Sequence, residues 1–385
     1  MRVPRGFRPA LVTAAAVAAV ATAATPALAG PALAGPASPA GLPGASSAVF
    51  VQTDDTAGNH VVAYHRAADG TLTPAGSYAT GGRGGILAGS VVDHTASQGS
   101  LAYDPAHALL YAVNAGSDTI TVFGVSGDRL TRREVLGSGG SFPVSVAVHG
   151  DLVYVLNALA GGNVQGFKVI GGFLAPLPGS RRPLGLDPAE TPQFTSTPGQ
   201  VAFTPDGSQL VVTTKNNGND IDVFGVGFGG RLSARPVVNA EAGTVPFAIS
   251  FDQSGHLVIA EAGTNALATF VLSSRGTARL LNEAGTGQAA TCWVTPAGPY
   301  LYASNAGSAN VSGFISSAGG ALTLLGSTGT DAGTVDAAAA AGFLYVQTGA
   351  NGIVDEFAIG AGGSLTKIGS VTVPGAAGGE GIVAS

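Results

Sequence analysis

The chain has 385 residues, 60 of them glycine, with 45% hydrophobic residues, 10% charged residues and a formal net charge of −6. This hydrophobic content excludes a disordered chain, and the negative charge with only three lysines argues against binding nucleic acid or anionic membranes. Cys292 is the sole cysteine, so an intrachain disulfide is excluded and the fold must be held by burial and strand pairing.

The N-terminus has the pattern of an export signal. Three arginines within the first eight residues precede an apolar stretch over residues 10–24, and Ala27–Ala29 offers small residues for cleavage. We predict a signal peptide over residues 1–29 and a flexible Pro/Gly/Ala leader over residues 30–45, so the mature chain would be secreted and free of the membrane. A membrane anchor is the alternative, although about 15 apolar residues are too few to span a bilayer.

A short apolar strand that ends in a polar residue recurs along the rest of the chain. The seven copies are Val49–Thr53, Leu110–Asn114, Val153–Asn157, Leu210–Thr214, Leu257–Glu261, Leu301–Asn305 and Leu344–Thr348. Their spacing of roughly 45 residues is the length of one four-stranded propeller blade.

Each copy lies within a larger unit. In the fourth unit, a strand over residues 200–203 leads through the turn Pro205–Gly207 into the repeated strand, and the alternating strand Ile221–Phe224 follows. The innermost strands are rich in small residues, as at Ala337–Ala341, which suits strands crowded round a central axis.

The two ends of the repeat array complement each other. The first unit lacks an inner strand, whereas Gly381–Ala384 extends beyond the last unit. We therefore predict an all-β fold over residues 46–385, a seven-bladed β-propeller closed by the C-terminal strand. A pair of β-sandwiches or another β-array is the alternative.

Two connections between blades are unusually long, residues 81–98 and residues 178–198. Both join an outer strand to the next inner strand, so they lie on the face where the repeated strands end, and we expect any site on that face. Arg83, Arg181 and Arg182 could reach over the channel from these insertions, where guanidinium groups suit a carboxylate or phosphate. A solvated turn is the alternative for the Arg181–Arg182 pair.

The unit Phe-x-Pro-Asp-Gly-x-x-Leu-x-Val, followed by Ile-x-Val-Phe and Gly-x-Leu, resembles the lactonase-type seven-bladed propellers. That family includes bacterial 6-phosphogluconolactonases and fungal enzymes that cyclise carboxymuconate. The resemblance covers the chain from about residue 46 to 385. It implies a secreted lactonase-like protein that hydrolyses or isomerises a small anionic lactone or a related sugar acid.

The sequence departs from this family at the positions that carry its chemistry. Inner strands of the family often begin Pro-His or Pro-Arg-His, whereas the matching positions here are Pro143-Val144, Pro198-Gly199 and Pro246-Phe247. The family also places a glutamate at the end of the second strand of a central blade, and Glu261 stands at that position.

Lactone hydrolysis needs a base that activates water and a cation or donor that stabilises the oxyanion. Glu261 is the candidate base and Lys215, at the equivalent corner of the fourth blade, is the candidate cation. Asn114, Asn157 and Asn305 end equivalent strands and are predicted to line the channel mouth as substrate-binding residues. A turn carboxylate is the alternative for Glu261, and a solvated side chain is the alternative for Lys215.

We predict no cofactor and no metal, because the six histidines are scattered without the spacing of a zinc site. The expected partner of this monomer is a small-molecule substrate or ligand. The rival hypothesis is a non-catalytic exported propeller that binds a ligand or protein on its channel face, and a structural module of the cell envelope is a third. A buried Glu261 with a strongly shifted pKa beside Lys215 would favour catalysis.

Overall fold

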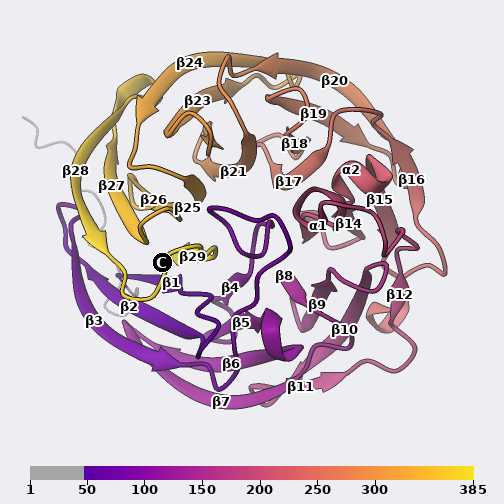
Figure 1. Cartoon of the computed structure of the whole chain (residues 1–385). Helices are drawn as coiled ribbons and strands as arrows, with labels where there is room; N and C mark the ends of the chain where they lie inside the picture. Colours follow the sequence, from indigo (N-terminus) through magenta and orange to yellow (C-terminus); the bar gives the residue numbers. More distant parts are fainter. Residues whose placement is uncertain (1–46) are drawn as a thin grey trace, which may run out of the picture. The chain divides into compact units, whose positions relative to one another are not determined.

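The computed structural model describes residues 47–385, and the predicted signal peptide and leader fall outside the described residues. Within this range, seven antiparallel sheets surround a central axis (Figure 1). Each sheet has four strands, and the third gains one short additional strand. The all-β seven-bladed propeller predicted from the repeat is therefore confirmed.

Four strands follow one another from the innermost to the outermost position of each blade. From the axis outward, blade one contains β29 (Ile382–Ala384), β1 (Ala48–Gln52), β2 (His60–Arg66) and β3 (Leu72–Ala79), and blade two contains β4 (Leu101–Asp104), β5 (Leu109–Asn114), β6 (Thr119–Ser126) and β7 (Arg129–Gly137). Blade three contains β8 (Pro143–His149), β9 (Leu152–Asn157), β10 (Asn163–Ile170) and β11 (Phe173–Pro176), and the short strand β12 (Arg182–Pro183) also pairs with β10. Blades four and five contain β13 (Val201–Phe203), β14 (Gln209–Thr213), β15 (Asp220–Gly225) and β16 (Val237–Ala240); and β17 (Pro246–Phe251), β18 (Leu257–Glu261), β19 (Ala266–Leu272) and β20 (Ala278–Gly285). Blades six and seven contain β21 (Thr291–Ala297), β22 (Tyr300–Asn305), β23 (Asn310–Ser316) and β24 (Leu322–Gly329); and β25 (Thr334–Ala340), β26 (Phe343–Thr348), β27 (Ile353–Ile359) and β28 (Leu365–Thr372).

The second strand of each blade forms the core because both of its faces pack against neighbouring blades. Every residue of β1, β5, β14 and β18 is buried, which explains why the repeated segments are continuously apolar instead of alternating. The outer strands bury few residues, and β24 exposes most of its length.

Hydrogen bonds between neighbouring blades help to hold the ring together. In three blades, a buried tyrosine of the second strand donates its hydroxyl to a glycine carbonyl of the following blade. These pairs are Tyr154 with Gly230, Tyr302 with Gly363 and Tyr345 with Gly70, at 2.7, 2.9 and 2.8 Å.

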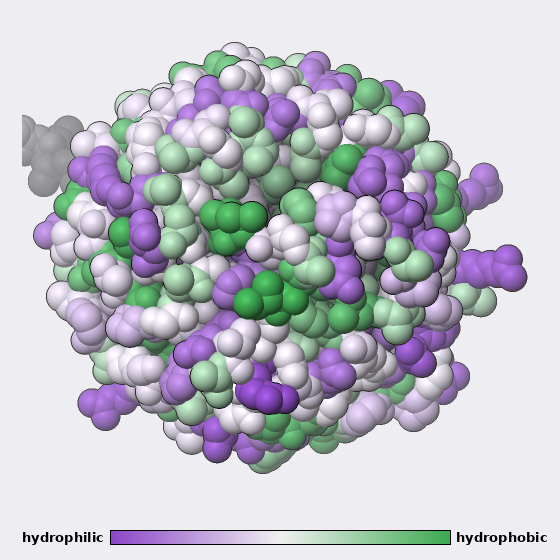
Figure 2. All heavy atoms as spheres, in the orientation of Figure 1, coloured by the Kyte–Doolittle hydropathy of each residue, from purple (hydrophilic) through white to green (hydrophobic). Residues whose placement is uncertain are grey.

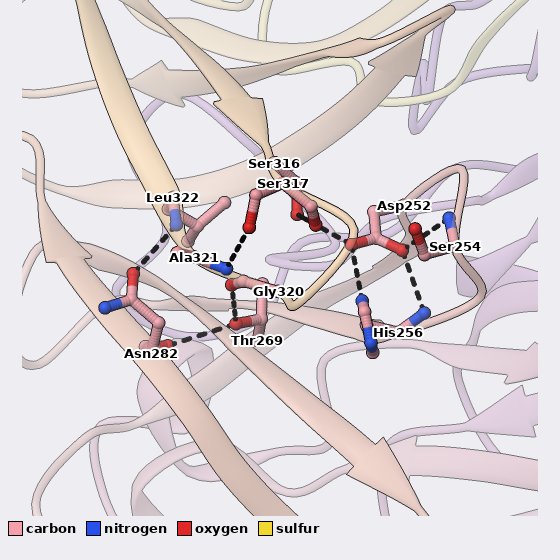
Figure 3. A network of polar contacts seen from close by, with 10 residues as sticks. All are labelled: Asp252, Ser254, His256, Thr269, Asn282, Ser316, Ser317, Gly320, Ala321 and Leu322. Carbon is pink, nitrogen blue, oxygen red and sulfur yellow. Dashed lines mark hydrogen bonds and ion pairs between the residues drawn. The ribbon is translucent and has the colours of Figure 1, made fainter.

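Polar contacts also join blade five to blade six (Figure 3). Asp252 accepts a hydrogen bond from Ser316 Oγ of blade six at 2.7 Å and pairs with His256 Nδ1 of its own blade at 2.9 Å. Thr269 Oγ1 donates to the Gly320 carbonyl at 2.6 Å. The first and the last strand of the described range also pair in one blade, where β29 lies beside β1 with the register Phe50↔Val383.

Two single-turn helices, α1 (Gln193–Ser196) and α2 (Lys215–Gly218), lie side by side on the face shown in Figure 1. The sequence predicted no helix, because one turn is too short to show a 3.6-residue period. Among the described residues, none of the helices has the length and apolar character needed to cross a membrane.

Candidate functional site

The first long insertion, which we call the channel segment (residues 81–98), lies inside the ring of blades (Figure 1). Ser97 Oγ donates to the Val144 carbonyl of blade three at 2.9 Å, and Trp293 Nε1 of blade six donates to the Ser97 carbonyl at 2.7 Å. Gln98 exchanges two hydrogen bonds with the Val294 backbone, each 3.0 Å long. The segment therefore bridges blades on opposite sides of the axis, whereas the sequence indicated only that it lies on the face where the repeated strands end.

A cavity of about 170 Å³ remains between the channel segment, α1 and the inner ends of blades four to six. Its walls are mainly apolar, and they include Val92, Phe194, Phe247 and Trp293. Lys215, Asp93 and Cys292 are the ionisable residues of the lining. Figure 2 shows hydrophobic residues near the centre of this face, and the channel segment itself exposes Ile86 and Val91. This cavity is the candidate functional site.

Lys215 is the cation of the cavity and is only 1% exposed. Its Nζ donates hydrogen bonds to the carbonyls of Ala96 and Phe194 at 2.7 and 2.6 Å, so one side chain joins both long insertions. The ammonium also lies 5.2 Å from the centre of the Phe247 ring. Burial lowers the pKa of Lys215 to about 7, and the nearby Asp93 opposes this shift.

The corner that places Lys215 is strained. Lys215 follows β14 with φ of 51°, in the left-handed region that a residue with a side chain seldom adopts. Asp54 occupies the equivalent corner after β1 and has φ of 53°. In both blades this conformation turns the chain sharply at the end of the second strand, and both side chains are buried at the channel.

Asp93 is the carboxyl group that acts electrostatically on Lys215. It is 4% exposed and accepts hydrogen bonds from the backbone N–H groups of Thr95, Ala96 and Ser97 at 2.8–2.9 Å. Burial raises the pKa of Asp93, while these donors and Lys215 limit the increase. Sequence reasoning placed Asp93 in an insertion but gave it no role, although the polar alternation Asp93-x-Thr95-x-Ser97 is the pattern of a side chain that organises its own turn.

Glu261 is buried, as catalysis would require, but Lys215 is not among the groups that shift its pKa. Its Oε2 accepts a hydrogen bond from Thr264 Oγ1 at 3.2 Å. The pKa of Glu261 is raised to about 8, mainly by burial and in smaller part by the neighbouring Glu283 and Glu241. Between residues 47 and 385, no hydrogen bond or ion pair joins Glu261 to Lys215, and Glu261 does not line the cavity. The structure therefore separates Glu261 from Lys215, and Asp93 is the carboxyl group that lines the cavity together with Lys215 and acts on it electrostatically.

The three asparagines expected at the channel mouth are fully buried and lie outside the cavity lining. Their amide groups bind neighbouring strands and turns. The acceptors include Thr121 Oγ1 for Asn114, Ser138 O for Asn157 and Ser312 Oγ for Asn305. These side chains hold the strand ends together, which leaves no exposed surface for a substrate.

The three arginines also lie away from the cavity lining. Arg83 and Arg181 are exposed. The guanidinium of Arg182 donates to the carbonyls of Ser233 and Leu232, both at 2.7 Å, and thereby links the second insertion to blade four. The described residues contain no group of three or more His, Cys, Asp or Glu side chains that could hold a metal ion.

Further buried acids surround the base of the channel segment. Glu380 Oε1 accepts a hydrogen bond from the Gly99 N–H at 2.8 Å, and Asp54 accepts one from Gln52 Nε2 at 2.8 Å. Burial raises the pKa values of Asp54 and Asp336 to about 7 and that of Glu380 well above its ordinary value. The channel segment is thus packed against carboxyl groups that hold their protons near neutral pH.

These features define a seven-bladed propeller with a buried carboxyl group and a buried amine in the lining of one small, mainly apolar cavity on its channel face. Comparison with protein-family models and with curated protein sequences gives no match. Among solved structures, a candidate 6-phosphogluconolactonase from Bacteroides fragilis is similar, with a TM-score of 0.67 and 17% identity over 90% of this chain and 99% of that chain. The periplasmic gluconolactonase of Pseudomonas aeruginosa matches with a TM-score of 0.67 and 18% identity, covering 88% and 98%.

A protein from Lactobacillus plantarum matches with a TM-score of 0.69 and 21% identity, covering 88% of this chain and 99% of that chain. The resemblance to lactonase-type propellers that the repeat unit indicated is confirmed at the level of the fold. Since one fold hosts many functions, the activity must be argued from the cavity itself.

Proposed function

We propose that this chain is an exported, monomeric lactonase-like propeller that hydrolyses a small cyclic ester in the cavity beneath the channel segment. The observation that carries the proposal is the placement of Lys215 and Asp93 together in the lining of one mainly apolar cavity. The similarity of the fold to a gluconolactonase supports this reaction class.

The cavity suits a small ring. An engineered cavity of about 150 Å³ accommodates benzene, so the volume of about 170 Å³ has room for a five- or six-membered lactone. The apolar walls would exclude bulk water and strengthen each electrostatic contact inside. They also favour a ring with few hydroxyl groups over the sugar acid that the resemblance implied.

The two charged groups supply complementary roles. An ammonium has three N–H groups, and Lys215 uses two of them on the carbonyls of Ala96 and Phe194. The third can donate to the lactone carbonyl and stabilise the developing oxyanion. The Asp93 carboxylate, held by the N–H groups of its own turn, can accept a proton from the attacking water.

Hydrolysis of a panel of five- and six-membered lactones by the purified chain tests the proposal. We expect turnover that Asp93→Asn lowers by about 10²-fold or more, the usual scale for loss of a general base. Glu261→Gln is the matched control, because it changes a buried carboxyl outside the cavity. Turnover that depends on Glu261 and is indifferent to Asp93 would overturn this assignment of roles.

The second candidate function is ligand binding without catalysis. The observation that favours it is that four donors of its own turn already occupy the Asp93 carboxylate. Trp293 is the sole tryptophan of the chain and lines the cavity, so its fluorescence reports occupancy directly. A saturable fluorescence change without turnover above the uncatalysed rate would favour a binding propeller.

A further inference from the structure

We propose that Lys215 is also a reactive amine that captures small, mainly apolar aldehydes or ketones as an imine inside the cavity. This chemistry is distinct from ester hydrolysis, because it uses the neutral amine as a nucleophile instead of the ammonium as a donor. The inference rests on the position of Nζ, on the Asp93 carboxyl group in the same cavity lining and on the composition of the cavity walls.

The hydrogen bonds of Lys215 suit a neutral amine. A neutral amine carries two hydrogens and one lone pair, and the carbonyls of Ala96 and Phe194 accept two hydrogen bonds from Nζ. The lone pair then occupies the remaining tetrahedral position of Nζ, and the Lys215 side chain lines the cavity. The surrounding burial lowers the pKa of Lys215 to about 7, so a substantial fraction of the amine is neutral at physiological pH.

Asp93 supplies the acid that imine formation needs. The Nζ lone pair forms a C–N bond to the carbonyl carbon while the C=O π pair moves to oxygen, which takes a proton. A second proton, delivered from the Asp93 carboxyl, lets this hydroxyl leave as water as the C=N bond forms. Both protons are balanced by the two that the amine loses, so amine and carbonyl give imine and water without an oxidant. In the neutral imine Nζ has no hydrogen and Asp93 regains its proton. In the protonated imine Nζ keeps one N–H, which can donate to one of the two backbone carbonyls, and Asp93 stays ionised.

The cavity walls select the carbonyl compound. Val245, Phe247, Trp293 and several alanines surround Lys215, and no arginine lines the cavity. The volume of about 170 Å³ fits roughly six to eight heavy atoms by comparison with the cavity that holds benzene. A phosphate or a second carboxylate would be buried without a partner, which is costly. Benzaldehyde matches these limits, whereas glyoxylate has the reactive group but also a carboxylate.

The other two lysines of the chain provide internal controls. Lys168 is exposed, and Lys367 forms ion pairs with Asp331 and Asp355 at 3.2 and 2.6 Å. These ion pairs raise the pKa of Lys367. Asp93 and Cys292 are the charged or titratable groups that act on Lys215, and burial keeps the Cys292 thiol protonated by raising its pKa to about 12. Lys215 is thus the lysine that is buried in a cavity and has a lowered pKa.

The test is reductive trapping of the full chain with benzaldehyde and cyanoborohydride at pH 7, followed by peptide mass mapping. We expect one benzyl group per chain on Lys215, at least ten times the occupancy on Lys168 or Lys367, and little trapping with glyoxylate. Lys215→Arg should abolish this adduct, with circular dichroism as the check on folding. Asp93→Asn should slow trapping about tenfold without redirecting it.

The selectivity within the unmodified chain keeps the test decisive even if a variant fails to fold. Equal modification of all three lysines, or an unmodified Lys215 while Trp293 fluorescence shows that benzaldehyde enters, would overturn the proposal. Absence of both signals would overturn it as well, because the cavity would then not admit its expected ligand. Trapping does not report lactone hydrolysis, so either proposal can fail while the other stands.

Discussion

Replacing Asp54 by asparagine should stabilise the protein above neutral pH. Asp54 is fully buried at the base of the channel segment, and burial is the main reason that its pKa rises from 3.8 to about 7. The folded state therefore holds a proton that the unfolded state releases between about pH 4 and 7. Native stability is fully present below the ordinary pKa and is lost as the pH rises through the folded pKa.

The magnitude follows from the size of the shift. A shift of about three units at ~1.4 kcal/mol per unit corresponds to a loss of up to ~4 kcal/mol at pH 8. Asparagine is neutral at every pH, has nearly the same shape and tolerates the φ of 53° at this corner. If the Gln52 amide turns over, its Oε1, which is buried without a hydrogen-bond partner, can accept a hydrogen bond from the new amide in place of the bond that Gln52 Nε2 now donates to Asp54. We expect Asp54→Asn to add about 1–3 kcal/mol at pH 8 after local relaxation, and close to nothing at pH 4.

Urea unfolding followed by Trp293 fluorescence at pH 4, 6 and 8 measures this difference. Asp69→Asn is the control, since Asp69 lies on the surface and the hydrogen bonds from Thr71 lower its pKa. That variant should show no gain at pH 8. A destabilisation by Asp54→Asn of the same size at pH 4 and pH 8 would refute the reasoning, because it would mean that the carboxylate is ionised and held by its hydrogen bonds.

Two further predictions concern the cavity. Lactone hydrolysis should have a narrow pH optimum on the acid side of neutrality. Asp93 must be ionised, which requires a pH above its raised pKa, and Lys215 must be protonated, which requires a pH below its lowered pKa of about 7. Initial rates from pH 4 to 9 test this, and a rate that still rises as the pH approaches 9 would contradict it. Gly349→Ala should displace the channel segment, because an added Cβ would collide with the Val92 carbonyl, whereas the Cβ added by Gly285→Ala meets no neighbour within 4 Å. We expect ligand binding, measured by Trp293 fluorescence, to weaken at least tenfold in Gly349→Ala alone. Equal binding by both variants would count against a functional channel segment.

The propeller could be predicted because each blade repeats the same local information. Strands such as Leu110–Asn114 are apolar throughout and are bounded by turn residues, so their number and spacing indicate the architecture without any long-range contact. The observed β5 and β18 match these segments within one residue at each end. Local patterns therefore determine where the strands begin and end.

The candidate site could be predicted only in part, because it depends on where an irregular segment travels. Lys215 was identifiable from its corner, but nothing local in the sequence indicates that the channel segment places Asp93 in the same cavity lining. The asparagines illustrate the opposite error. Asn114 ends a strand as a channel-lining residue would, yet its amide binds Thr119 and Thr121 on the neighbouring strand. Strand alternation does not reveal whether a polar group is already satisfied.

The bridge formed by the channel segment has a consequence for how this protein comes apart. In most repeat architectures each unit contacts only its neighbours, so the array can open one unit at a time. Here Ser97 and Gln98 connect blade three with blade six through hydrogen bonds at Val144, Trp293 and Val294. Separating blade three from blade six therefore also requires these hydrogen bonds to break. We expect the blades to unfold together in one cooperative transition, instead of one after another.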